Sequence, residues 1–320
     1  MRLKRRSSIT NSNPPPSSPE PILPIPTPEG WSEWQTLPCP HPFDSASLAE
    51  TLDGGQAFRW TCLAEGNWEG VFADLVARLH LDPASGSVRI SLPEPLLCVE
   101  NVARVARYLG RDTDWKGLVD ALPWRSDPHL HQAIAAFPGL RILRQPMEET
   151  LLGFLCSATK RIIQIRQMCA LLARDAGVEI APDVHRLPTF REIAGGGPER
   201  LNGCLLGFRA KYILATARFL AEHPGWLEET EHLPYPEAKV RLRQLPGVGE
   251  KVADCVLLFG AGKLEAFPVD TWISQTLARR YHLTGWTNSQ LAEFGRAHFG
   301  PAAGLAQQFL FSWERRFGKP

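Results

Sequence analysis

Several features are missing from this chain of 320 residues, and each absence excludes a class of protein. The sequence has no Cys-x-x-Cys motif, and its seven cysteines are odd in number and widely spaced. Disulfide-stapled folds and zinc ribbons depend on paired, regularly spaced cysteines. We therefore expect neither kind of fold, and we expect the protein to work in a reducing compartment.

Long apolar runs and a strong net charge are also missing. No run approaches the roughly 18 apolar residues that mark a membrane-spanning helix, and the N-terminus lacks the apolar segment of a secretory signal. The net charge is only +1, so no basic field over the whole surface indicates a nucleic-acid partner. Any DNA-binding surface must come from local clusters of side chains or from backbone N–H groups.

The sequence does contain enough apolar material for two or three hydrophobic cores. Its 44% apolar and 22% charged residues are typical of a soluble globular protein. Residues 1–30 differ, because they are basic at first and then rich in proline and serine. We expect a disordered tail there. Its basic cluster could contact DNA or act as a targeting signal, and it consists of Arg2, Lys4, Arg5 and Arg6.

The order of the predicted elements indicates the fold class. Alternating apolar residues predict strands at 68–72, 76–81 and 88–92, with a turn at 83–87. From about residue 100 the spacing becomes helical, and it predicts helices near 100–109, 115–121, 129–137, 148–174, 189–194, 198–222, 235–243, 250–261, 271–281, 289–297 and 301–315. This is an α+β pattern: an antiparallel sheet domain over residues 31–140, packed on a mainly helical domain over residues 141–320.

The segment Leu-Pro-Gly-Val-Gly-Glu-Lys-Val-Ala-Asp at 245–254 is the most informative in the chain. Gly247 and Gly249 form a tight turn just before a helical run, where glycine allows the backbone to approach a ligand closely. The N–H groups at a helix N-terminus then suit a phosphate. We predict that Gly247, Val248 and Gly249 contact DNA.

Lys251 and Asp270 are the candidate catalytic pair. Lys251 lies on the first turn of the helix that follows the glycine turn, where the helix dipole disfavours a positive charge and so favours the neutral, nucleophilic amine. Asp270 follows Pro268 and Val269, so it can cap the next helix and face the amine. A capped helix with an ordinary surface lysine is the simpler alternative for either residue taken alone.

Together, this segment and Pro268–Val269–Asp270 resemble the helix-hairpin-helix glycosylases with a Gly/Pro-Asp loop. In that family the lysine attacks C1′ of a damaged nucleoside and the aspartate assists. The resemblance implies a bifunctional glycosylase and AP lyase, because alkyl-purine glycosylases of the same fold usually lack the lysine. A non-catalytic helix-hairpin-helix DNA-binding module, the other alternative, needs neither Lys251 nor Asp270.

A second set of residues resembles the 8-oxoguanine branch of this family. Gly-Gly-Gln-Ala-Phe-Arg-Trp at 54–60 is similar to a segment in which a glycine carbonyl accepts the N7–H of 8-oxoguanine, a role that falls on Gly55 here. Normal guanine has a bare lone pair at N7, which would repel that carbonyl. By the same resemblance Gln307 bonds the edge of the extruded base, and Phe311 and Cys255 stack on its two sides. Taken alone, Phe311 and Cys255 are more often core residues.

A third region resembles the part of the family that handles the duplex. Phe208 matches an aromatic wedge that fills the gap left by an extruded base, and Arg209 matches a reader of the orphan cytosine. Thr159, Lys160 and Arg161 stand where animal and fungal members have three asparagines. We expect Lys160 and Arg161 to contact phosphates, although a solvated basic helix face is an equal alternative.

The chain departs from the family pattern at the other opposite-base readers. Thr159 replaces the asparagine that contacts the orphan cytosine, and Gln164 replaces a cytosine-reading arginine. Trp272 replaces a histidine that follows the aspartate in the family. We therefore expect the protein to discriminate weakly between the bases opposite the lesion.

The resemblance implies the remaining functional assignments. The partner is double-stranded DNA that contains an oxidised purine, the process is base-excision repair, and the enzyme is a monomer. No metal or organic cofactor is expected, although hairpin carbonyls near Gly247 and Gly249 could hold a structural monovalent cation. The four-cysteine iron–sulfur loop of some relatives is excluded. The protein should be intracellular, in the nucleus of a eukaryote or in the cytoplasm and nucleoid of a prokaryote.

Overall fold

The structure is a computed structural model that describes residues 24–39 and 41–318. Most of the predicted tail, with its basic cluster, lies outside the described residues. The stretch that follows contacts the body of the protein, because the Ile25 N–H donates to Asn67 Oδ1 at 3.1 Å and Trp34 Nε1 donates to the Ile25 carbonyl at 3.1 Å. Ordered contacts therefore begin before the boundary that the sequence predicts at residue 30.

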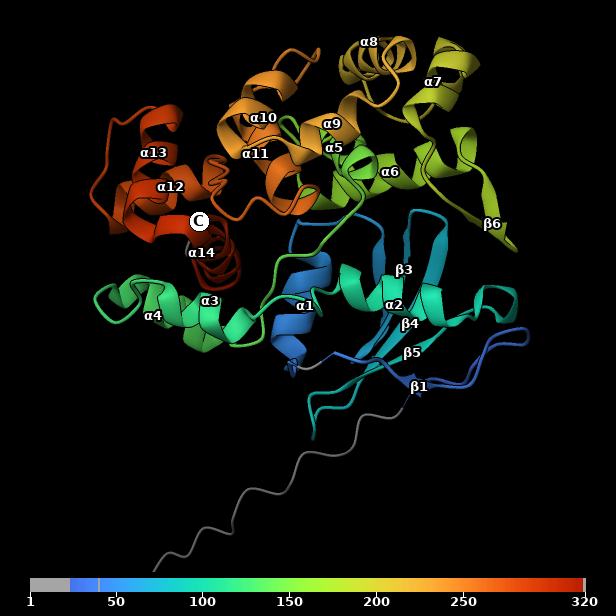
Figure 1. Cartoon of the computed structure of the whole chain (residues 1–320), viewed down its shortest axis with the longest axis horizontal. Helices are drawn as coiled ribbons and strands as arrows, with labels where there is room; N and C mark the ends of the chain where they lie inside the picture. Colours follow the sequence, from blue (N-terminus) through green and yellow to red (C-terminus); the bar gives the residue numbers. More distant parts are fainter. Residues whose placement is uncertain (1–23, 40, 319–320) are drawn as a thin grey trace, which may run out of the picture.

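An antiparallel sheet forms the N-terminal part of the protein (Figure 1). Its strands lie in the order β1-β5-β4-β3-β2. They are β1 (Gln35–Thr36), β2 (Trp60–Ala64), β3 (Asn67–Phe72), β4 (Leu75–Leu81) and β5 (Val88–Ser91). Helices α1 (Ser45–Asp53) and α2 (Val99–Tyr108) bury Leu48, Leu52 and Val105 in the same core as the sheet. The three predicted strands are confirmed.

Helices make up most of the chain after the sheet, as Figure 1 shows. They are α3 (Trp115–Ala121), α4 (Pro128–Ala136), α5 (Met147–Leu155), α6 (Ile162–Ala176), α7 (Phe190–Gly196), α8 (Arg209–Glu222), α9 (Trp226–His232), α10 (Tyr235–Leu242), α11 (Glu250–Phe259), α12 (Thr271–Arg280), α13 (Asn288–Phe299) and α14 (Ala303–Phe317). Short 3-10 turns lie at η1 (Glu94–Leu96), η2 (Pro198–Leu201) and η3 (Gly300–Ala302), and a small hairpin joins β6 (Glu179–Ala181) to β7 (Val184–His185). The α+β fold class is confirmed.

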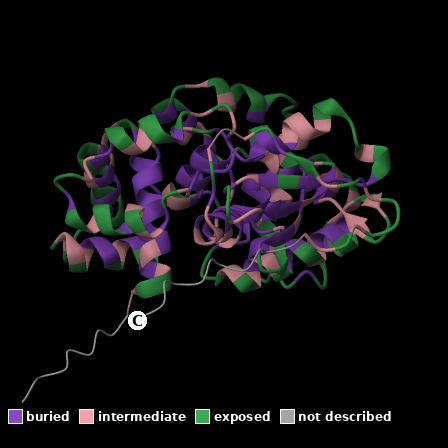
Figure 2. Cartoon of the chain, turned by 90° about the horizontal axis from the view of Figure 1, so that it is seen from below, coloured by how far each residue is buried: buried purple, intermediate pink, exposed green. Residues whose placement is uncertain are grey.

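Two hydrophobic cores lie in the described part of the protein. The first core lies under the sheet and includes Trp60, Leu79 and Tyr108. The second core fills the helical body, and it already includes Trp115 and Leu130 of α3 and α4. Helices α3 and α4 lie within the range predicted for the sheet domain, yet they join this second core, and α4 packs on the C-terminal helix α14. Figure 2 shows the buried residues gathered inside both parts and the exposed ones along the outer helices.

Two of the predicted helices are wrong in extent. The segment 148–174 forms two helices, α5 and α6, which are separated by a turn at 156–161 in which Thr159 has φ +54°. The segment 198–222 is interrupted between η2 and α8, where Gly203, Leu205 and Gly207 all have positive φ. Residues in this left-handed region cannot continue a right-handed helix. Helix α9 and the β6–β7 hairpin were not predicted.

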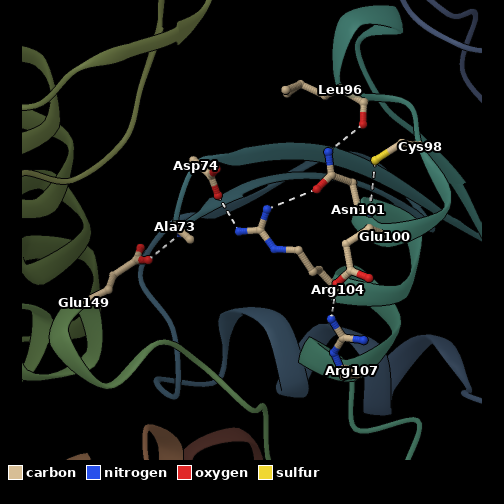
Figure 3. Close-up of polar contacts among 9 residues, drawn as sticks. All are labelled: Ala73, Asp74, Leu96, Cys98, Glu100, Asn101, Arg104, Arg107 and Glu149. Carbon is tan, nitrogen blue, oxygen red and sulfur yellow. Dashed lines mark hydrogen bonds and ion pairs between the residues drawn. The ribbon is translucent and has the colours of Figure 1, made fainter. Parts of the chain in front are cut away.

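The turn between β3 and β4 ties the sheet to helices on two sides (Figure 3). The Ala73 N–H donates to Glu149 Oε2 of α5 at 2.8 Å, and Asp74 pairs with Arg104 of α2. Arg104 also donates to Asn101 Oδ1 at 3.0 Å, which fixes its guanidinium. Burial raises the pKa of Glu149 to about 7, so the junction contains a carboxyl group that titrates near neutral pH.

Candidate active site and DNA-contact surface

The glycine turn between α10 and α11 has the geometry that its sequence predicts. Gly247 has φ +82°, and a Cβ there would lie 2.8 Å from Tyr212 Cβ, so only glycine fits without strain. Gly249 is the N-cap of α11, and no side chain caps this helix. Its first-turn N–H groups are therefore open to a phosphate. Val248 differs from its neighbours, because its side chain is buried and its N–H donates to the Leu245 carbonyl at 3.1 Å.

An acidic residue opens α11, and basic residues of α10 neutralise it. Glu250 pairs with Lys239 at 2.8 Å and with Arg243 at 2.7 Å. Lys239 also pairs with the buried Asp254 at 3.0 Å, and Tyr235 donates to Asp254 Oδ1 at 2.8 Å. A free carboxylate at this position would repel a DNA phosphate. The ion pairs remove that repulsion and fix α11 against α10.

Lys251 lies half-buried on the first turn of α11. Its Nζ donates to Ser157 Oγ at 3.2 Å and lies 4.8 Å from the centroid of the Phe154 ring. Cys255 is one turn further along the same helix, and its thiol is buried. Burial raises the pKa of Cys255 to about 12, and the nearby Lys251 acts in the opposite direction. The thiol is therefore neutral at physiological pH and offers an apolar surface next to the amine.

Asp270 serves as the N-cap of α12, as the sequence predicts. Its Oδ1 accepts the N–H of Ile273 at 2.9 Å. Burial raises the pKa of Asp270, whereas the Ile273 N–H and the charge of Lys251 lower it. Asp270 also acts electrostatically on the Cys255 thiol. The structure thus brings Lys251, Cys255 and Asp270 into one cluster.

The other predicted pocket residues lie on α14 and at the end of α1. Gly55 has φ +94°, and a Cβ there would lie 3.0 Å from Ile162 Cδ1 and 3.7 Å from Phe311 Cε1. Gln307 is one turn before Phe311 on α14 and is only 5% exposed. Its Oε1 has no hydrogen-bond partner among the residues that the structure describes. A buried acceptor without a partner is costly, so Gln307 is ready to bind a donor from a ligand.

The side chain of Gln56 fixes the backbone around Gly55. Its Nε2 donates to the Arg141 carbonyl at 2.7 Å, and its Oε1 accepts the Leu143 N–H at 2.9 Å. Gln145 Nε2 donates to the Gln56 carbonyl at 2.7 Å. These bonds anchor the segment to the chain that leads into the helical body. Beyond it, Phe58 is buried in the helical core and Trp60 in the core under the sheet.

The turn at 156–161 joins the nucleophile cluster to the pocket. Ser157, within the turn, accepts from Lys251, and Ile162, directly after the turn, lies against Gly55. Neither Ser157 nor Ile162 was predicted to belong to the site. Ser157 is 94 positions from Lys251 along the chain, so no local sequence pattern indicates the contact.

The predicted DNA-contact residues differ in their exposure. Phe208 is 53% exposed at the start of α8, and Thr159, Lys160 and Arg161 are exposed on the turn before α6. Arg209 is instead 3% exposed, and it donates to the Ala158 carbonyl through Nε at 3.1 Å. Its role as a cytosine reader stays a prediction, because its guanidinium is engaged within the protein in this structure.

Two of the three positions that depart from the family pattern, Gln164 and Trp272, lie at the starts of helices. Gln164 Oε1 accepts the Arg161 N–H at 3.1 Å and so caps the start of α6. Trp272 is 37% exposed at the start of α12. The side chain of Gln164 is therefore used to hold the turn before α6, next to the exposed Lys160 and Arg161.

Neither metal-binding clusters nor membrane-spanning helices are found in the described part of the chain. No group of three or more His, Cys, Asp or Glu side chains within residues 24–39 and 41–318 is arranged to hold a metal ion. No described helix is both long and apolar enough to cross a membrane. All seven cysteines are free thiols.

Comparison with known proteins identifies relatives over most of the chain. The family model described as the N-terminal domain of 8-oxoguanine DNA glycosylase matches residues 40–151. The N-glycosylase/DNA lyase of Saccharomyces cerevisiae is 32% identical over 270 residues, which cover 75% of this chain and 70% of that protein. The N-glycosylase/DNA lyase OGG1 of Arabidopsis thaliana is 28% identical over 330 residues, which cover 97% of this chain and 89% of that protein.

Solved structures agree with these sequence matches. The 8-oxoguanine glycosylase/lyase of Clostridium acetobutylicum in its apo form superposes with a TM-score of 0.76 at 30% identity, covering 83% of this chain and 92% of that one. The same enzyme bound to DNA with cytosine opposite 8-oxoguanine gives a TM-score of 0.78 at 27% identity, covering 90% and 99%. The chain belongs to the 8-oxoguanine DNA glycosylase/lyase family.

Proposed function

We propose that this protein removes 8-oxoguanine from duplex DNA and then cleaves the strand as an AP lyase. The observation that carries the proposal is the half-buried lysine amine on the first turn of α11, which bonds Ser157 Oγ at 3.2 Å and interacts electrostatically with a buried thiol and a helix-capping carboxylate. Family membership supports the same activity. The process is base-excision repair of oxidised purines.

In the proposed mechanism, Lys251 is the nucleophile. The neutral amine forms a bond to C1′ as the bond from C1′ to the base nitrogen breaks, and the departing purine takes up a proton. Asp270 stabilises the positive charge that develops on the sugar. The C1′–O4′ bond then breaks, O4′ takes up the proton that the nitrogen loses, and a Schiff base remains between Nζ and C1′. Loss of a proton from C2′ then expels the 3′ phosphate by β-elimination, which breaks the strand.

Lesion recognition is proposed to use residues from the end of α1, from α11 and from α14. The carbonyl of Gly55 accepts the N7–H that distinguishes 8-oxoguanine from guanine. Gln307, whose buried Oε1 is unpaired among the described residues, bonds the edge of the base. Phe311 and the neutral thiol of Cys255 supply apolar surfaces for its two faces. The small space around Gly55 supports this role, since a methyl group there would press on Ile162 and approach Phe311.

DNA binding is proposed to use backbone donors and exposed side chains rather than bulk charge. Gly247 and Gly249 present N–H groups at the start of α11 to a phosphate. Phe208 is exposed enough to fill the space left by an extruded base. Lys160 and Arg161 are exposed in the same turn as Ser157, which contacts Lys251, and we propose that they bind phosphates.

The remaining assignments are also proposals. We infer that the enzyme acts as a monomer on intracellular DNA, in a nucleus or a nucleoid. The reaction needs no metal or organic cofactor, because the lysine supplies the nucleophile and the carboxylate supplies the charge. A monovalent cation at the hairpin carbonyls near Gly247 and Gly249 would have a structural role only.

A lesion panel tests the proposal and separates it from its alternatives. Single-turnover excision is measured on duplexes with 8-oxoguanine, an alkylated purine or undamaged guanine, with wild type and Lys251→Gln. We expect wild type to excise 8-oxoguanine and nick the strand, and Lys251→Gln to bind DNA but do neither. Preferred excision of the alkylated purine would indicate the alkyl-purine branch. Binding without excision of any base would indicate a non-catalytic DNA-binding module.

A further inference from the structure

Ser157 makes a hydrogen bond to the proposed nucleophile that its place in the sequence does not suggest. The residue is buried in the turn between α5 and α6. Its Oγ lies 3.2 Å from Lys251 Nζ and 2.7 Å from the carbonyl oxygen of Phe154. The serine hydroxyl is therefore placed between an amine and a backbone acceptor.

The two bonds fix which partner donates. A carbonyl oxygen can only accept, so the hydroxyl hydrogen of Ser157 points to Phe154. The oxygen then faces Lys251 with a lone pair and must accept an N–H from the amine. A hydroxyl that could rotate freely would be able to donate to the lone pair of a neutral amine and so mask the nucleophile. The Phe154 carbonyl prevents this.

The turn that contains Ser157 is itself held in place by a buried cation. Arg209 donates to the Ala158 carbonyl through Nε at 3.1 Å and to Thr159 Oγ1 through Nη2 at 3.1 Å. Thr159 has φ +54°, a conformation that β-branched residues rarely adopt and that surrounding contacts must maintain. These bonds hold the turn, and with it Ser157, in one conformation.

We propose that Ser157 is a positioning residue for Lys251. Its hydroxyl holds one N–H of the amine and leaves the nucleophilic lone pair free to point at C1′. The proposal rests on the function proposed above, because it assumes that Lys251 is the nucleophile. The same contact orients the amine for attack on a damaged nucleoside and on an abasic sugar, so both reactions should depend on it.

The test compares Ser157→Ala with Ser157→Thr, which keeps the hydroxyl. Single-turnover excision of 8-oxoguanine and borohydride trapping on a duplex with a preformed abasic site are measured for each. Small misplacement of a reacting group costs up to about a hundredfold in rate, so we expect Ser157→Ala to slow both reactions about ten- to hundredfold. Ser157→Thr should restore both to within a few-fold of wild type. DNA affinity and melting temperature should change little in either variant.

Ser126→Ala is a matched control. Its hydroxyl makes the same kind of bond, to the carbonyl of Pro123 three residues earlier at 3.1 Å, but no lysine within residues 24–39 and 41–318 bonds to it. This variant should keep wild-type rates. If Ser157→Ala does not fold, Ser157→Cys replaces the strong oxygen acceptor with a weak one, and it should be slow where Ser157→Thr is not.

The outcomes distinguish a failure of this inference from a failure of the proposed function. Wild-type rates in Ser157→Ala or Ser157→Cys, with an inactive Lys251→Gln, would overturn the positioning role and leave the function intact. Slow rates in Ser157→Thr equal to those of Ser157→Ala, together with a lowered melting temperature, would show a purely structural role and would also overturn it. A wild-type protein that cannot be trapped on either DNA would instead refute the function.

Discussion

Asp270 offers a way to separate the capping of a helix from the chemistry of the site. Its carboxylate accepts the Ile273 N–H at 2.9 Å as the N-cap of α12. Asparagine caps a helix about as well as aspartate, whereas alanine at an N-cap costs about 0.5–2 kcal/mol. Asp270→Asn should therefore change the free energy of unfolding by less than about 0.5 kcal/mol, while Asp270→Ala should lose about 1 kcal/mol.

Both substitutions remove the negative charge that acts on Lys251, so both should slow the reaction to a similar degree. Removing one preorganised group that stabilises transition-state charge costs about 10²–10³-fold in rate, or roughly 2.7–4 kcal/mol. The two variants should consequently differ in stability but agree in rate. A residue that served only as a cap would give the opposite pattern, with asparagine active and alanine impaired.

The assay is single-turnover excision from an 8-oxoguanine duplex with enzyme in excess, with a denaturant unfolding curve for each protein. Enzyme excess removes product release from the measured rate. If Asp270→Asn kept the wild-type rate, the reasoning about its charge would be refuted and Asp270 would be a helix cap alone.

Three further predictions follow from other parts of the structure. Burial raises the pKa of Glu149 from 4.5 to about 7, so the folded protein binds this proton more tightly than the unfolded chain does. The free energy of unfolding should therefore fall by up to about 3 kcal/mol as the pH rises from about 4.5 to above 7. Glu149→Gln should gain melting temperature relative to wild type at pH 8 and show no such gain at pH 5; an equal difference at both pH values would contradict the assignment. Gly55→Ala should cost about 1–2 kcal/mol of stability because of its positive φ, and it should slow excision of 8-oxoguanine without weakening binding to undamaged duplex; unchanged excision would remove Gly55 from the pocket. Thr159 and Gln164 replace two base readers, and a good bidentate contact is worth about 1–3 kcal/mol. The rate of excision should therefore vary by roughly tenfold or a little more among the four opposite bases. A thousandfold preference for cytosine would show that other residues read the opposite base.

Local patterns in the sequence predicted the elements whose signals are local. The glycine turn at 247–249 and the cap at Asp270 were correctly located, because glycines in a turn and a capping residue at a helix start determine the local backbone conformation. The three strands at 68–72, 76–81 and 88–92 were found for the same reason, since alternation is a property of neighbouring residues. The three central strands of the sheet and the start of α11 could therefore be predicted without the structure, whereas the outer strands β1 and β2 were not.

Contacts between distant segments were not predictable in this way. The turn at 156–161 contains neither glycine nor proline, so the segment 148–174 has the pattern of one helix. The bonds from Arg209 to Ala158 and Thr159 help to hold that turn, and they come from about 50 residues away. The bond between Ser157 and Lys251 spans 94 residues. The place of α3 and α4 in the helical core likewise depends on packing of α4 against α14, which only the tertiary structure shows.

The proposed mechanism requires that the amine of Lys251 forms the covalent bond to DNA. The most direct measurement reduces the reaction on an 8-oxoguanine duplex with borohydride, digests the cross-linked protein, and identifies the modified residue by mass spectrometry. We expect the reduced sugar adduct on Nζ of Lys251, in the peptide that contains the start of α11. An adduct on another lysine or on the N-terminal amine would contradict it.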